Sequence, residues 1–208
     1  MTRSLPELDD ATRVLVQLSA AIAAGSEATV RRWITEAAQS APASEIEEVV
    51  LQSYLFCGFP RALNAAREWR RVAGVRAPAS DEADDITLVS EWRTRGEQTC
   101  SAVYGDMYEK LRLNVRDLHP ALDAWMVTDG YGKVLSRPGL DLERRELCVV
   151  AACAAMGQDR QLHSHLHGAL NVGASPEAII AAIEAVAELI GAERARSARQ
   201  LLARVLGK

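Results

Sequence analysis

The sequence has few aromatic residues and no long apolar run. Aromatic side chains make up 5% of its 208 residues, and runs that alternate apolar and polar residues, as half-buried strands do, are absent. No stretch reaches the length of a membrane-spanning helix. The start, Met1 to Pro6, has no apolar secretion signal. These absences favour a helical protein without a membrane partner, and we expect it in the cytoplasm.

An excess of positive charge and a close cysteine pair are also lacking. The formal net charge of -4 argues against a nucleic-acid partner, because phosphates require a basic face. The four cysteines are Cys57, Cys100, Cys148 and Cys153, with no Cys-x-x-Cys pair. Cys148 and Cys153, five positions apart, face different sides of a helix. We expect small buried thiols rather than a disulfide framework.

Helix signals are abundant in the first 74 residues. Apolar residues recur at helical spacing from Pro6, which opens a first helix, to Gly25, which ends it. Ser26 is predicted to cap a second helix. Three further signals mark the next two helices: a capping box of Ser44 and Glu47, a start at Pro60 and an end at Gly74.

A polar segment with Pro and Gly but no apolar period follows, and it predicts a linker over 75–86. The predicted division is a helical half-repeat without reactive residues over 1–74, this linker, and a helical domain with the candidate site over 87–208. The helices expected beyond the linker span 87–101, 106–117, 120–129, 141–156, 159–172, 176–190 and 193–206.

The two ends of the chain resemble each other. The segment 20–25, Ala-Ala-Ile-Ala-Ala-Gly, is similar to 152–157, Ala-Cys-Ala-Ala-Met-Gly, at a shift of 132. Farther on, the shift is 133: Ile46, Val50, Gly58 and Arg61 match Ile179, Ile183, Gly191 and Arg194. This agreement over four helices predicts a duplicated helical unit, although alanine-rich helical hairpins also look alike by chance.

All four histidines lie in the second half, three of them within residues 161–167. On a regular helix, His163 and His167 share one flank and His165 lies on the other, because successive residues turn by about 100°. The three rings therefore cannot converge on one ion. A His-x-x-x-His pair gives zinc only two ligands, so we predict no metal site.

His165 has a candidate acidic partner. Glu146 lies 19 residues upstream, on the preceding helix of a hairpin that turns near Gly157. In a straight antiparallel hairpin the two levels differ by roughly 7 Å, so contact requires crossed helices or a bridging water. A carboxylate there would orient the imidazole as a proton-transfer group. The alternative is a structural histidine beside the core.

Several motifs in order resemble those of the carboxymuconolactone decarboxylase family, part of the alkylhydroperoxidase D-like superfamily. They lie in the residue ranges 103–105, 130–132, 137–141, 145–147, 161–165 and 168–174. In the first half, 54–64 looks like the family's closing segment. The resemblance implies an all-α fold of two related alkylhydroperoxidase D-like repeats packed as one body.

The family has a hydroperoxidase branch that uses a Glu, two cysteines and a His in fixed order. These positions in this sequence are Glu146, Gln158, Gln161 and His165. Thiol peroxidase chemistry needs an attacking thiolate and a resolving thiol, and glutamine supplies neither. An antioxidant, peroxiredoxin-like function is therefore the alternative hypothesis, which would require a redox-active Cys148 or Cys153.

The other branch removes carbon dioxide from γ-carboxymuconolactone without a cofactor. The resemblance implies a lyase for a small carboxylated or lactone-like substrate, with His165 and Glu146 handling the proton. Arginine suits carboxylates because its guanidinium is a planar fork. The predicted substrate-binding residues are Arg137, Arg145, Gln158, Gln161, Tyr54 and Phe59, and Phe56 is also expected beside the pocket.

One site per chain is expected. Across the duplication, Glu146 falls on Arg13 or Val14 and His165 on Arg32, and none of these is a general base near neutral pH. Family resemblance also implies a homo-oligomer, a trimer or hexamer. A third hypothesis is a non-catalytic oligomeric binding protein in which the histidines only pack.

Overall fold

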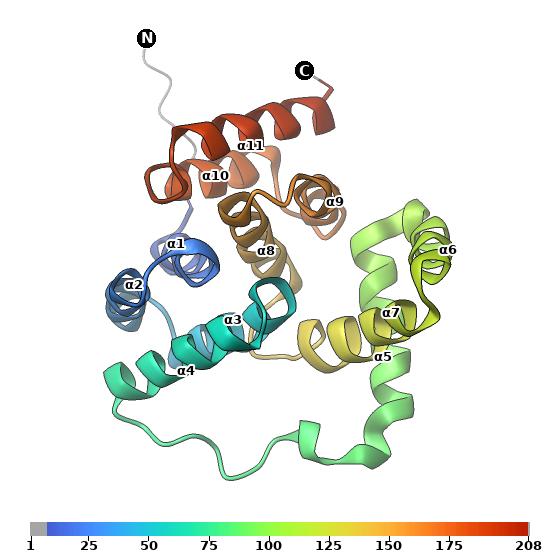
Figure 1. Ribbon diagram of the computed structural model, residues 1–208, viewed down its shortest axis with the longest axis horizontal. Helices are drawn as coiled ribbons and strands as arrows, with labels where there is room; N and C mark the ends of the chain where they lie inside the picture. Colours follow the sequence, from blue (N-terminus) through green and yellow to red (C-terminus); the bar gives the residue numbers. More distant parts are fainter. Residues whose placement is uncertain (1–7, 208) are drawn as a thin grey trace. The chain divides into compact units, whose positions relative to one another are not determined.

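A computed structural model describes residues 8–207 of the chain, and the regular secondary structure of these residues is entirely helical, with no strand (Figure 1). Pro6, the predicted start of the first helix, lies outside the described residues. Contacts divide the chain into two compact units. The repeat unit joins Met1–Val75 with Gly139–Lys208, and the intervening unit comprises Arg76–Pro138.

The repeat unit contains two sets of four helices. The first repeat consists of α1 (Asp10–Ala24), α2 (Glu27–Ser40), α3 (Ala43–Cys57) and α4 (Phe59–Ala73). The second consists of α8 (Leu142–Met156), α9 (Asp159–Asn171), α10 (Pro176–Ile190) and α11 (Ala192–Val205). Equivalent helices begin 132 residues apart for the first two pairs and 133 apart for the last two. This correspondence agrees with the predicted duplication.

The turns of the two repeats also match. Asp9 caps α1 and Asp141 caps α8, each accepting a hydrogen bond from a backbone N–H three residues on. Gly58 and Gly191 join the last two helices of each repeat with φ of 79° and 84° and the same ψ of 159°. Because only glycine adopts this backbone region readily, the same residue stands at both corners.

The core of the repeat unit forms where α1 lies against α8, with α3 packed on α8 and α10 on α1. Figure 1 shows α8 passing between α1 and α9. Alanine-rich faces bring the two central helices close enough for the Ser19 hydroxyl to donate to the Cys148 carbonyl at 2.7 Å. Leu15, Leu18 and Leu147 are buried in this core, each worth about 2 kcal/mol in removed apolar surface.

The intervening unit contains α5 (Val89–Tyr104), α6 (Tyr108–Leu118), α7 (Pro120–Trp125), the π-helix η4 (Met126–Leu135) and three short 3-10 turns. The turns are η1 (Glu82–Asp84), η2 (Ile86–Leu88) and η3 (Gly105–Met107). α5 packs closely on η4: a Cβ added to Gly132 would lie 1.9 Å from the Trp92 carbonyl oxygen. These two helices can touch only because this position lacks a side chain.

Some predicted elements differ from the structure. The helix expected over 120–129 ends its α-helical part at Trp125 and continues as a π-helix to Leu135, where small residues allow α5 to approach. The predicted capping box of Ser44 and Glu47 is wrong. Helix α3 begins after Pro42, which makes no side-chain cap bond, and the Glu47 carboxylate instead accepts hydrogen bonds from Arg70 and Trp69.

The grouping into units also differs from the predicted boundaries at 74 and 87. Residues 74–81 are not helical, as expected of a linker. However, the helices that follow up to Pro138 form a unit of their own, and the second repeat begins only near Gly139. The sequence pattern could not separate them because helix succeeds helix on both sides of Pro138. No helix within residues 8–207 is long and apolar enough to span a membrane.

Candidate active site

Glu146 and His165 are in direct contact inside the repeat unit. The Nδ1 atom of His165 lies 2.8 Å from the Oε2 atom of Glu146. The two residues are 0% and 5% exposed, so the contact is shielded from bulk water. Of the two arrangements considered from the sequence, direct contact is the one observed, and no bridging water is needed. A carboxylate only accepts hydrogen bonds, so this geometry assigns the hydrogen to Nδ1.

The local sequence explains how this pair is placed. Asp141 caps α8, so Glu146 lies in its second turn, and Gly157 ends α8 in the left-handed conformation with φ of 68°. The chain then reverses into α9, where Leu162 and Leu166 are buried against the core. His165 lies beside this apolar stripe, so its ring is held at the inner side of α9.

The second carboxylate oxygen of Glu146 has no hydrogen-bond partner among the described residues. Oε1 is buried together with the rest of the side chain. An unsatisfied buried acceptor is costly, typically about 1–3 kcal/mol. It is therefore a position at which a hydroxyl, an enol or a water would be held well.

The aromatic residues predicted beside the pocket lie at the end of α3 and the start of α4. The Phe56 ring meets the His165 ring nearly perpendicularly, with centroids 5.5 Å apart and an interplanar angle of 85°. Tyr54 stacks instead on Phe59, with centroids 4.8 Å apart. Phe59 is 63% exposed at the start of α4. Of these three aromatic residues, Phe56 makes the ring contact with the imidazole.

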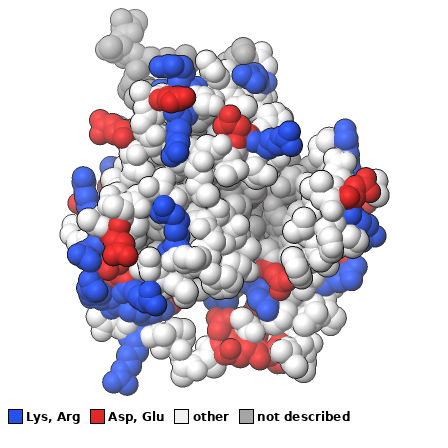
Figure 2. All heavy atoms as spheres, viewed as in Figure 1, with Lys and Arg blue, Asp and Glu red and all other residues white. Residues whose placement is uncertain are grey.

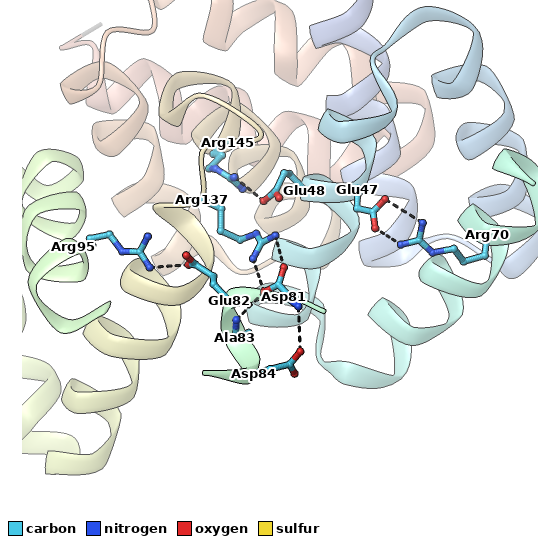
Figure 3. Close-up of polar contacts among 10 residues, drawn as sticks. All are labelled: Glu47, Glu48, Arg70, Asp81, Glu82, Ala83, Asp84, Arg95, Arg137 and Arg145. Carbon is cyan, nitrogen blue, oxygen red and sulfur yellow. Dashed lines mark hydrogen bonds and ion pairs between the residues drawn. The ribbon is translucent and has the colours of Figure 1, made fainter. Parts of the chain in front are cut away.

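Arg145, a predicted carboxylate-binding residue, is fully buried in a hydrogen-bond network, of which Figure 3 shows the contact with Glu48. Its guanidinium donates to the Glu48 carboxylate at 2.8 Å, the Gln52 side-chain oxygen at 3.0 Å and the Leu140 carbonyl at 3.0 Å. These bonds use all three guanidinium nitrogens. Arg145 therefore joins α8 to α3 of the first repeat. This structural role replaces its predicted role as a residue that binds the substrate carboxylate.

Arg137, the other predicted carboxylate-binding residue, belongs to the intervening unit. Its two terminal nitrogens each lie 3.0 Å from one oxygen of Asp81 (Figure 3). The hydrogen bonds from Arg137 hold the pKa of Asp81 below its usual value. This guanidinium already has a carboxylate partner within its own unit.

The two glutamines at the family's cysteine positions, Gln158 and Gln161, are exposed at the start of α9. His163 and His167 are exposed on the flank of α9 away from His165, with ring centroids 4.9 Å apart. Burial, and then the charge of His163, lowers the pKa of His167. The predicted separation of the histidines is confirmed, and no group of three metal-ligating residues occurs within residues 8–207.

The cysteines lie in apolar surroundings. Cys148 and Cys153 are 0% and 3% exposed, and desolvation raises the pKa of each to about 12. Cys57 is partly buried, and desolvation raises its pKa to about 11. None of the four cysteines forms a disulfide. These three thiols would remain protonated near neutral pH, which is unfavourable for attack on a peroxide.

The equivalent positions of the first repeat lack the pair. The helix boundaries keep the shift of 132 through α2, so Val14 stands opposite Glu146 and Trp33 opposite His165. The predicted counterpart Arg32 is therefore displaced by one residue. Val14 is 6% exposed, and Trp33 packs against the core. An acid–imidazole pair in one repeat thus corresponds to two apolar side chains in the other.

Sequence reasoning missed Glu48 and Gln52, the partners of Arg145. Both are buried polar residues on α3, 6% and 1% exposed. Their four-residue spacing, which places them on one face of the helix, was the available signal. Their partner could not be found that way, because Arg145 lies more than 90 positions away in the chain.

The comparison with known proteins agrees with this architecture. The model of the carboxymuconolactone decarboxylase family matches residues 2–71 and 120–204. The chain belongs to this family, and the two matched segments correspond to a duplicated version. Residues 103–105, one of the motifs compared above, lie outside the matched segments.

A curated relative is Peroxisomal protein 2 from Schizosaccharomyces pombe. It is 28% identical over 142 residues, which is 66% of this chain and 65% of the relative. The chain therefore spans less than two thirds of the length of that relative.

Proposed function

We propose that the chain is a cofactor-independent enzyme of the carboxymuconolactone decarboxylase type. In this proposal His165, oriented by Glu146, transfers a proton on a small carboxylated or lactone-like substrate. The observation that carries the proposal is the buried 2.8 Å contact between His165 Nδ1 and Glu146 Oε2. With the hydrogen on Nδ1, Nε2 is the ring nitrogen that exchanges a proton with the substrate.

The proposed reaction balances without an oxidant or reductant. The bond between the substrate carboxylate and its carbon breaks, carbon dioxide leaves, and the electron pair moves into a conjugated carbonyl as an enolate. Protonated His165 then delivers its proton from Nε2 to carbon, and water restores that proton. Burial strengthens the interaction between the Glu146 carboxylate and the imidazolium that carries the proton.

The buried Oε1 atom of Glu146 supports the same proposal. This atom has no partner among the described residues, so it is suited to accept a hydrogen bond from a substrate hydroxyl or an enol. A thiol mechanism has less support, because Cys148 and Cys153 are buried thiols with a pKa of about 12 and the family's cysteine positions are glutamine.

The test measures carbon dioxide release and solvent deuterium incorporation with γ-carboxymuconolactone and related carboxylated lactones. His165→Asn should lower the rate about 10²- to 10⁴-fold, the usual contribution of a general acid–base group. Glu146→Gln should lower the rate less, because Glu146 orients the His165 ring and does not itself transfer the proton. His163→Asn is the matched control on the exposed flank of the same helix, and its rate should equal that of the wild type.

Two results would overturn this proposal. One is wild-type protein that neither decarboxylates nor exchanges deuterium on any of these substrates. The other is a His165→Asn rate equal to that of the His163→Asn control. Alkylation of the cysteines distinguishes the proposed function from the peroxidase alternative. A peroxidase activity that disappears when Cys153 is alkylated would favour a thiol peroxidase instead.

We also propose a homo-oligomer of three or six chains acting on this small substrate. Large apolar side chains of the intervening unit are exposed, including Leu113 at 64%, Leu118 at 77% and Trp125 at 60%, and such side chains favour association. Basic and acidic residues are interspersed on the face in Figure 2, unlike the basic face of a nucleic-acid binder. Light scattering that gives a monomer would contradict this assembly. The cytoplasmic location stays a prediction.

A further inference from the structure

One face of α3 in the first repeat carries three residues that touch the second repeat. Glu48, Gln52 and Phe56 are spaced four residues apart, so they lie along the same side of the helix. Glu48 and Gln52 bond to Arg145, and Phe56 contacts His165. The face therefore follows α8 from its first turns to the imidazole on α9.

The polar end of this face fixes the position of α3 along α8. Gln52 accepts a hydrogen bond from Arg145 at 3.0 Å, and its amide nitrogen lies 3.5 Å from the Arg145 carbonyl oxygen. Glu48 accepts from the same guanidinium at 2.8 Å. Because Arg145 immediately precedes Glu146, the contact that anchors α3 also anchors the residue that bonds His165.

The aromatic end limits how the imidazole can turn. The edge-to-face contact between Phe56 and His165, at 5.5 Å and 85°, is a favourable aromatic arrangement. A partial rotation of the imidazole about its bond to Cβ would tilt the ring plane and carry Nδ1 away from Glu146 Oε2. The same rotation would disturb the perpendicular contact with Phe56.

We propose that Phe56 is a positioning residue, through which the first repeat holds the His165 ring with Nδ1 on Glu146. This inference rests on the proposed function for its catalytic meaning. The first repeat, which lacks a reactive pair of its own, thereby contributes to the site of the second. Phe56 itself exchanges no proton.

The same face of α10 differs, so the arrangement is not a general result of the duplication. The positions equivalent to Glu48, Gln52 and Phe56 are Ala181, Ala185 and Leu189. None of these carries a charged or aromatic side chain. The α3 face belongs to the repeat that supports the site, and α10 supplies a matched control.

The test observes the His165 ring by nitrogen-15 NMR of the full chain labelled at histidine, with the signal assigned by its loss in His165→Asn. The wild type should show a single dominant tautomer with hydrogen on Nδ1. In Phe56→Ala the ratio of this state to all others should fall about two- to tenfold, the size expected for loss of an aromatic pair. Phe56→Tyr should restore the wild-type ratio.

Two further variants separate ring contact from bulk packing. Phe56→Leu retains apolar volume without a ring, and it should shift the ratio in the same direction as Phe56→Ala. It also replaces that variant in the test if alanine prevents folding. Leu189→Ala, at the equivalent position of α10, should leave the His165 signal unchanged.

The proposal is overturned if Phe56→Leu retains the wild-type ring state, or if Leu189→Ala changes it as much. Its failure is distinguishable from that of the proposed function. If the Phe56 variants change the His165 tautomer ratio but His165→Asn leaves turnover intact, only the catalytic role of His165 is overturned. If turnover needs His165 but the Phe56 variants change neither turnover nor the His165 tautomer ratio, only the positioning role of Phe56 is overturned.

Discussion

The two repeats of this chain have the same helices and the same turns but different residues at equivalent buried positions. Both have an aspartate cap, a glycine corner, and an arginine, Arg61 or Arg194, that donates to carbonyl oxygens at the end of the central helix. Glu146 and His165, however, correspond to Val14 and Trp33. Residues that shape the backbone are thus shared, whereas the reactive side chains are confined to the second repeat.

The buried arginine is a further difference between the repeats. Arg145 is 0% exposed and bonded to the first repeat, whereas its counterpart Arg13 is half exposed and pairs with the exposed Asp10. The same residue type therefore has two environments, because a carboxylate and an amide reach α8 from α3. Of these two arginines, Arg145 bonds to the other repeat, whereas Arg13 pairs within its own helix.

The largest effect expected from this asymmetry is that of Arg145→Ala. The substitution removes a buried cation and its bonds to Glu48, Gln52 and Leu140. It should lower the free energy of unfolding by about 3–5 kcal/mol, as breaking a buried ion pair does. Arg13→Ala, the control, should cost less than about 0.5 kcal/mol because its pair is exposed. Urea unfolding followed by circular dichroism measures both, and similar losses would contradict the asymmetry.

A smaller and symmetric effect is expected at the shared corners. Gly58 and Gly191 adopt φ of 79° and 84°, and a Cβ at either position would meet no atom closer than 3.7 Å. The cost of alanine is therefore conformational, about 1–3 kcal/mol for each. Thermal unfolding of Gly58→Ala and Gly191→Ala should give similar losses. A loss at only one corner would show that the turns are not equivalent.

The smallest effect concerns acid stability. Hydrogen bonds from Arg31 and Arg199 lower the pKa of Glu68 in the first repeat and Glu184 in the second. Each carboxylate therefore stabilises the fold above its unfolded pKa of about 4.3, and this contribution is lost as pH falls through the lowered folded pKa. Glu68→Gln and Glu184→Gln should each remove less than about 1 kcal/mol at neutral pH.

Urea titrations at pH 7 and pH 3 measure this acid dependence. Each variant should lose less stability than the wild type between the two pH values, because its carboxylate no longer takes up a proton on unfolding in acid. Stability that depends equally on pH in wild type and variants would contradict the assignment. Arg93, which pairs with Glu97 on the exposed side of α5, offers a control pair outside the repeats.

The helical fold and the duplication follow from local patterns in the sequence. Apolar residues at helical spacing and glycine at Gly25, Gly74 and Gly157 placed most helices within a few residues of their observed bounds. The π-helix after Trp125 could not be predicted, because it depends on how closely α5 packs on it. Local propensity carries no information about such contacts.

For the site, the sequence by itself determined which residue types are present: a Glu and a His on successive helices, with glutamine at both positions that the resemblance assigns to cysteine. Only the tertiary structure decided that Glu146 and His165 touch, that Arg145 bonds to side chains of α3, and that Phe56 lies against the imidazole. The physical reason is that helix periodicity fixes the face of a side chain. Its partner depends on packing between helices far apart in the chain.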